Sequence, residues 1–222
     1  MRIAREGYPY IIPLLLIAIA LFLFKIWWLA LIFLFVGAFC LYFFRDPERI
    51  FRGTENQIAS PADGKVIWIW KQNDLEAISI FMSPLDVHVN RAPVSGKISM
   101  IEYMKGKFMV AYDERASIDN ERNAISIDHG NASIRFVQIA GILARRIICW
   151  RKPGDVIERG DRIGLIKFGS RVDVFFPPGS RISVEKGQRV KAGESVIGEL
   201  PCIAGTNSRC LRRYIKESKV TI

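Results

Sequence analysis

A serine nucleophile and a histidine base, with an aspartate to orient the base, can together perform acyl-transfer chemistry. A serine hydroxyl is a weak nucleophile, so it needs a nearby base that a third group orients. The base is easy to search for because the chain has only two histidines. His129 lies in the turn "DHGN", where we expect a structural residue, which leaves His88 as the candidate base. Asp63 in "PADG" is the candidate third group, although Asp-Gly after proline is also ordinary turn chemistry.

The candidate nucleophile, Ser170, interrupts a run that otherwise predicts a β-strand. In "LIKFGSRVDVFFPPGS" (165–180) an apolar framework is broken by Gly169-Ser170. A glycine inside a strand usually marks a bulge, a bend or a close approach to the backbone. The context "FGSRVD" is not the G-x-S-x-G of a nucleophile elbow, so it gives a serine hydrolase no positive support. Because triads occur in several chain orders, the order of these residues does not exclude one.

The N-terminal region predicts a membrane anchor. Between residues 8 and 44 the sole charged residue is Lys25, which divides the region into apolar segments 8–24 and 26–44. Each is near the lower end of the about 17–25 residues that a spanning helix needs. Arginines flank both outer ends. The positive-inside rule then favours a transmembrane hairpin with both ends on the cytoplasmic side of the inner membrane. The alternative is one span plus a helix lying in the interface.

After this anchor (residues 1–45), residues 46–222 predict a mainly β domain. Short apolar runs alternate with turn signals about every 8–12 residues, which is typical of a barrel or sandwich. "DHGN" (128–131) predicts a hairpin turn. Two pairs of similar units occur: 60–66 with 92–98, and 154–164 with 187–198. They resemble the interlocked half-barrels of biotinyl and lipoyl domains, so we expect a barrel-sandwich-like domain. No lysine stands at a hairpin tip in an "MKM" or "DKA" context, which argues against a swinging-arm carrier.

The net charge of +10 indicates an acidic partner. With a membrane anchor next to the domain, an anionic membrane surface is the simpler partner, and we expect no nucleic acid. Basic clusters at 144–152 and 209–216 would lie against headgroups, unless they are merely solvated faces. The four cysteines have no metal-like spacing, so we predict neither disulfides nor a metal site. The sequence is compatible with a homo-oligomer and does not decide the oligomeric state.

Five motifs occur in an order that carries a family resemblance: "SPADGKV", "FMSPLDVHVNRAPVSGKI", "NERN" (120–123), "QIAGILARRI" (138–147) and "FGSRVDVFFP". Together they resemble the short, membrane-associated class of phosphatidylserine decarboxylase proenzymes. The resemblance spans roughly residues 45–200, and the hydrophobic N-terminus fits it too.

The resemblance implies self-cleavage at Gly169-Ser170 into a β subunit (1–169) and an α subunit (170–222). Ser170 would attack the preceding carbonyl, and β-elimination of the ester followed by loss of ammonia would leave a covalent pyruvoyl group. This cofactor would form a Schiff base with the amine of phosphatidylserine and act as the electron sink, giving phosphatidylethanolamine and CO2. His88 would be the base in processing and the proton donor in decarboxylation. Asp63 would orient it or pair with its charge.

One departure from the family bears on the substrate site. Longer members carry a second histidine three residues after the one matching His88, and this chain has Arg91 there. Arg91 would hold the lipid phosphate or be a surface strand residue. Asn120 and Asn123 are substrate-binding candidates through the resemblance alone. The rival function is a membrane-anchored, non-enzymatic β-barrel adaptor, which gives Gly169-Ser170 no purpose.

Overall fold

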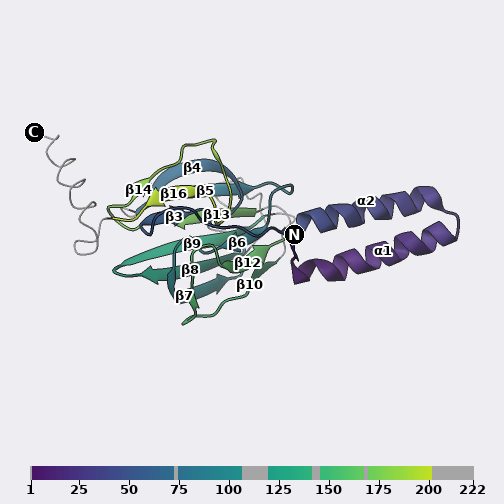
Figure 1. Cartoon of the computed structure of the whole chain (residues 1–222), viewed down its shortest axis with the longest axis horizontal. Helices are drawn as coiled ribbons and strands as arrows, with labels where there is room; N and C mark the ends of the chain where they lie inside the picture. Colours follow the sequence, from purple (N-terminus) through teal and green to yellow (C-terminus); the bar gives the residue numbers. More distant parts are fainter. Residues whose placement is uncertain (1, 73–74, 107–119, 142–145, 168–169, 202–222) are drawn as a thin grey trace, which may run out of the picture.

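Two helices precede a domain of strands and turns in the computed structural model (Figure 1). It describes residues 2–72, 75–106, 120–141, 146–167 and 170–201. The 3-10 turn η1 (Arg5–Gly7) leads into α1 (Tyr8–Leu23), and α2 (Trp27–Phe43) follows. The prediction of a mainly β domain after a helical N-terminus is confirmed.

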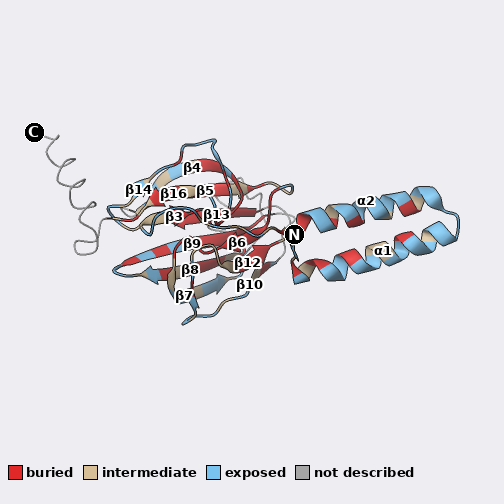
Figure 2. Cartoon of the chain, viewed as in Figure 1, coloured by how far each residue is buried: buried red, intermediate tan, exposed pale blue. Residues whose placement is uncertain are grey.

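The two helices lie side by side, and their outer ends meet at the β domain (Figure 1). At those ends β1 (Arg2–Ile3) pairs with β2 (Arg45–Asp46) in an antiparallel ladder. At the far end Lys25 takes a positive φ of 62° to reverse the chain. Most of the helical surface is exposed (Figure 2), and its exposed side chains are almost all apolar. Arg5–Leu23 is long and apolar enough to cross a membrane, and α2 is shorter.

Three sheets build the β domain. The largest has eight strands in the order β11-β7-β8-β9-β13-β5-β4-β15, and two three-stranded sheets have the orders β10-β12-β6 and β14-β16-β3. The strands are β3 (Gln57–Ala59), β4 (Gly64–Gln72), β5 (Leu75–Met82), β6 (Val89–Arg91), β7 (Gly96–Met104), β8 (Arg122–His129), β9 (Ala132–Ala140), β10 (Ile147–Cys149), β11 (Val156–Ile157), β12 (Arg162–Ile166), β13 (Ser170–Phe175), β14 (Arg181–Ile182), β15 (Arg189–Val190) and β16 (Val196–Glu199). The predicted hairpin turn at 128–131 is confirmed by the pairing of β8 with β9.

The paired units of the sequence occupy equivalent places in two halves of the domain. In one half β15 pairs with β4, and in the other β11 pairs with β7, each at the start of a long hairpin. Gly64 and Gly96 begin these hairpins with φ of 150° and 156°. A Cβ there would lie 2.0 Å from the carbonyl oxygen of Phe81 or 2.1 Å from that of Asp128. The repeated glycines are therefore required by close backbone approach.

The run 165–176 forms two strands that belong to different sheets. β12 ends at Ile166 in a three-stranded sheet, and β13 begins at Ser170 between β5 and β9 of the eight-stranded sheet. The chain therefore passes from one sheet to another between Ile166 and Ser170. Both neighbours of β13 come from the part of the chain before this crossing.

Two of the three hydrophobic clusters among the described residues position the site. The main cluster lies between the sheets and includes Val66, Ile80, Ile98, Ile127 and Val174. The second cluster joins the ends of the helices to the domain, and its members are Ala4, Ile11, Cys40, Phe43, Phe44, Val87, Val89 and Leu165. The base of the helical pair is thus packed into the domain by buried apolar contacts.

Replacing Gly96 with alanine should destabilise the protein more than replacing Gly154. Both residues have positive φ, so each replacement adds strain of about 1–2 kcal/mol. A Cβ at Gly96 would also meet a backbone oxygen, whereas at Gly154 nothing lies within 4 Å. We expect the thermal midpoint in detergent micelles to fall by roughly 3 °C for Gly154→Ala and by about 8 °C or more for Gly96→Ala. Equal losses would contradict the close approach of β7 to β8.

Candidate functional site

Ser170 is buried at the first position of β13. It is 0% exposed, and its register partners are Met82 on β5 and Ala140 on β9. Its Oγ lies 3.3 Å from the Met82 sulfur. Side chains alternate along a strand, so Ser170 shares its face with Val172, toward the main cluster. Gly169 lies outside the described residues.

His88 directly precedes β6 and is also 0% exposed. Its Nδ1 lies 2.9 Å from the backbone carbonyl oxygen of Asp86. A carbonyl oxygen can only accept a hydrogen bond, so we assign the proton of the neutral ring to Nδ1. Nε2 then carries the free lone pair, and it is buried with no hydrogen-bond partner among the described residues. An unpaired buried acceptor costs about 1–3 kcal/mol, and such atoms are often retained where they are used.

Burial also sets the charge of His88. Loss of solvation lowers the pKa of His88 to about 4. The hydrogen bond to Asp86 and the charge of Asp63 raise this pKa, and the charge of Arg45 lowers it further. The imidazole is therefore neutral at pH 7, as a general base must be before it takes a proton.

The fold brings His88 and Ser170 into one region. The amide of Ile166, at the end of β12, lies 3.3 Å from the carbonyl oxygen of His88. The chain from Ile166 to Ser170 is so short that it spans at most about 14 Å. Asn90 follows His88 by two residues, and its Nδ2 atom lies 3.7 Å from the Met82 sulfur. The same sulfur contacts Ser170.

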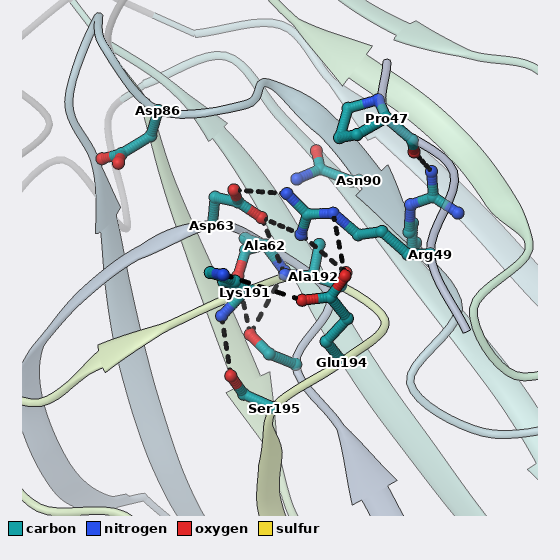
Figure 3. A network of polar contacts seen from close by, with 12 residues as sticks. Pro47, Arg49, Ala62, Asp63, Asp86, Asn90, Lys191, Ala192, Glu194 and Ser195 are labelled. Atoms are coloured by element: carbon teal, nitrogen blue, oxygen red, sulfur yellow. Dashed lines mark hydrogen bonds and ion pairs between the residues drawn. The ribbon is translucent and has the colours of Figure 1, made fainter. Parts of the chain in front are cut away.

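Asp63 is bound by an arginine that follows the second helix (Figure 3). The two guanidinium nitrogens of Arg49 lie 2.5 and 2.7 Å from the two carboxylate oxygens, and the amide of Ala192 donates a further hydrogen bond at 2.8 Å. We expected Asp63 to orient His88 or to pair with its charge. The Nδ1 atom of His88 contacts the Asp86 carbonyl, and the charge of Asp63 raises the pKa of His88.

Arg91 is placed inside the protein. It is 3% exposed, and its guanidinium donates to Asp46 at 2.9 Å, to the Pro47 carbonyl at 2.7 Å and to the Gly160 carbonyl at 2.9 Å. Burial lowers the pKa of Arg91. With these partners in place, the side chain ties the segment after α2 to the domain. This geometry argues against the expected contact between Arg91 and the lipid phosphate.

The two predicted asparagines lie near Ser170 in a buried polar network. Asn123 donates to the Gln138 side-chain oxygen at 2.9 Å, and Gln138 donates to that of Asn90 at 2.8 Å. Asn120 donates at 2.7 Å to the carbonyl of Ala140, the register partner of Ser170. The network thus runs across β8 and β9 to the strand that carries Asn90.

A cavity of about 1100 Å³ lies on the other face of the eight-stranded sheet. Trp68, Trp70, Asp173 and Phe175 are among its lining residues. Asp173 and Phe175 alternate along β13 with the residues that share the face of Ser170. Ser170 therefore lies on the core side of β13, away from this cavity.

The residues that we did not predict are those that hold the candidate catalytic groups: Phe43, Arg49, Asp86 and Gln138. The rings of Phe43 and His88 have centroids 4.1 Å apart. Asp86 closes a turn in which its carboxylate accepts from the Ser83 amide, so the composition of "SPLD" is a signal for its place. Phe43 and Arg49 reach the site from distant positions in the sequence, and no local pattern indicates such contacts.

Known proteins resemble this chain over most of its length. The sequence model of the phosphatidylserine decarboxylase family matches residues 36–198. A protein of Geobacter sp. (strain M21) named phosphatidylserine decarboxylase proenzyme is 46% identical, over 90% of this chain and 97% of its own. A protein of the same name from Geotalea uraniireducens (strain Rf4) is 43% identical, over 90% of this chain and 97% of its own. Another, from Syntrophus aciditrophicus (strain SB), is 46% identical, over 88% of this chain and 96% of its own. The chain therefore belongs to the phosphatidylserine decarboxylase family.

Proposed function

We propose that this chain is the proenzyme of a pyruvoyl-dependent decarboxylase that converts phosphatidylserine to phosphatidylethanolamine and CO2. Family membership supports this function over the adaptor, which has no use for the break at Gly169-Ser170. The single observation that carries the proposed chemistry is the bare Nε2 of His88, buried in the same region as Ser170.

In the proposed self-cleavage His88 is the base. Nε2 takes the proton of the Ser170 hydroxyl as Oγ attacks the carbonyl carbon of Gly169, and the bond between this carbon and the Ser170 nitrogen breaks. The proton then passes to the leaving nitrogen, so the amide becomes an ester. In the β-elimination a base takes the Cα proton of Ser170, a double bond forms between Cα and Cβ, and the bond between Cβ and Oγ breaks, which releases residues 1–169 with a free carboxylate. The enamine left on residue 170 gains a proton at Cβ and becomes an imine, and water replaces its nitrogen with the ketone oxygen and releases ammonia.

Asp63 has an indirect part in this proposal. A negative charge near His88 favours the imidazolium that forms when Nε2 takes the proton. Arg49 holds that carboxylate in place with two hydrogen bonds. Because both side chains are nearly buried, removal of one partner would leave an uncompensated charge at a cost of about 3–5 kcal/mol.

The surroundings of Ser170 suit a pyruvoyl group at this position. The side chain is buried among Met82, Ala140 and Val172, and ladders on both sides hold the backbone. The group supplies an electron sink for the bond to the departing carboxylate. His88 remains the proposed proton donor, and for that step it must first gain a proton. The phosphate and carboxylate of a bound phosphatidylserine would favour its charged form. Asn120 and Asn123 remain proposed substrate-pocket residues.

We propose further that residues 1–45 anchor the domain of residues 46–222 in the membrane as two spanning helices. The exposed surface of both helices is apolar, and Trp27 and Trp28 are exposed near the far turn, as at a membrane interface. Arginines at the opposite ends favour the cytoplasmic side for the domain. Exposed Arg146 and half-buried Arg151 belong to the first basic cluster, and residues 209–216 lie outside the described part.

The paired halves of the domain support the proposal that it is built from half-barrels like those of biotinyl and lipoyl domains.

Intact mass spectrometry of the freshly expressed protein tests the cleavage. We expect two chains, corresponding to residues 1–169 and 170–222, with the second lighter than a serine-started fragment by the mass of one ammonia. Ser170→Ala should leave one uncut chain, because it removes the attacking oxygen, and should abolish decarboxylation. An uncut chain in folded wild-type protein would contradict the proposed pyruvoyl cofactor and would favour the adaptor or the serine hydrolase.

The pH dependence of cleavage tests the role of His88. A base with a pKa of about 4 is fully neutral from pH 7.5 down to pH 5.5, so the cleavage rate should change less than twofold over this range and fall only as pH approaches 4. A histidine with an ordinary pKa near 6.5 would lose about tenfold between these values. Precursor made by cell-free translation into lipid nanodiscs, sampled over time on gels, gives the rate. A tenfold loss by pH 5.5 would show that the base is not a buried histidine of this kind.

A further inference from the structure

The last residue of the second helix forms a wall of the candidate site. The ring centroid of Phe43 lies 4.1 Å from that of His88, with the ring planes 35° apart, and both residues are 0% exposed. If the helices served for attachment alone, none of their residues would need to lie against the candidate base. The contact therefore indicates a second task for this end of the helix.

The ring of Phe43 is itself held firmly. It meets Phe44 edge to face at 5.0 Å and Phe39 at 6.3 Å. Val89 and Leu165 of the second hydrophobic cluster close the same space from the domain side. Such close packing leaves an aromatic ring few alternative rotamers. The orientation of Phe43 thus depends on how α2 sits on β6 and β12.

The charged groups around His88 have their own partners. Arg45 donates to the carbonyls of Tyr42 and Leu85. The carboxylate of Asp86 pairs with Arg189. Asp63 is bound by Arg49, as described above, and Lys167 reaches Tyr10 at 3.2 Å. The residues that pack with Phe43 in the second hydrophobic cluster are themselves apolar.

We propose that Phe43 is a positioning residue for the reaction: its ring fixes the plane of His88 and keeps water from the imidazole, so that the seating of α2 on the domain holds the base ready. The proposal rests on the proposed role of His88 as base. It gives the helical pair a part in the chemistry beyond membrane attachment. Removing the ring would admit water, which favours the charged imidazolium and displaces the pH range in which the base is free.

The test compares the pH profile of self-cleavage in Phe43→Ala and Phe43→Leu with that of the wild type, in the nanodisc assay. We expect the rate of Phe43→Ala to fall about tenfold between pH 7.5 and pH 5.5, as for a hydrated histidine. Phe43→Leu keeps an apolar side chain but lacks the ring, and its cleavage rate should fall by at least threefold over the same pH range. It also serves as the decisive variant if Phe43→Ala does not fold.

Phe136→Leu is the matched control. Phe136 is an equally buried phenylalanine on β9 in the main cluster, and among the described residues its ring has no contact with the ring of His88, so its replacement tests destabilisation without removing the ring that packs on the base. We expect its absolute rate to change while its profile stays flat to pH 5.5. A flat profile for Phe43→Leu, or an equal displacement for Phe136→Leu, would overturn the inference. Absence of cleavage in the wild type would instead overturn the proposed function, so the two failures are distinguishable.

Discussion

The hydrogen bond between His88 Nδ1 and the carbonyl of Asp86 determines what this site can do. It assigns the ring proton to Nδ1 and leaves Nε2 bare in a buried, apolar setting. In water such a bond would decide little, because solvent would satisfy either nitrogen. Here burial fixes the tautomer, so the turn that positions Asp86 also determines which ring nitrogen of the proposed base is free. The cost of the unpaired nitrogen is met by packing that includes Phe43.

The second constraint is the crossing between sheets. The end of β12 lies against the segment that carries His88, and the chain then runs from Ile166 to the start of β13 at Ser170. β13 lies in the centre of the eight-stranded sheet, between β5 and β9. A proposed nucleophile at the first position of this central strand is held by ladders on both sides. The same arrangement would keep the two pieces together after cleavage, since both neighbours of β13 precede Ser170.

Much of the fold followed from local pattern. The apolar segments around Lys25, the hairpin turn at 128–131 and the paired glycine units predicted the helices, a β-hairpin and two equivalent halves, because each rests on short-range chemistry. The break at Gly169-Ser170 was visible for the same reason. The partners of the candidate residues were not predictable in this way. Asp63 binds Arg49 and not His88, and Arg91 is buried against Asp46. These ion pairs join distant segments, and several arrangements would satisfy the same charges.

The most direct test of the account is the protonation state of His88 itself. Nuclear magnetic resonance of the uncleavable Ser170→Ala chain, with ¹⁵N-labelled histidine, reports which ring nitrogen carries the proton. The chain has only two histidines, so a His129→Asn variant assigns the signals. The account predicts a neutral ring with its proton on Nδ1 and a bare Nε2 at pH 7, unchanged down to about pH 5. A proton on Nε2, or an imidazolium at pH 7, would contradict it.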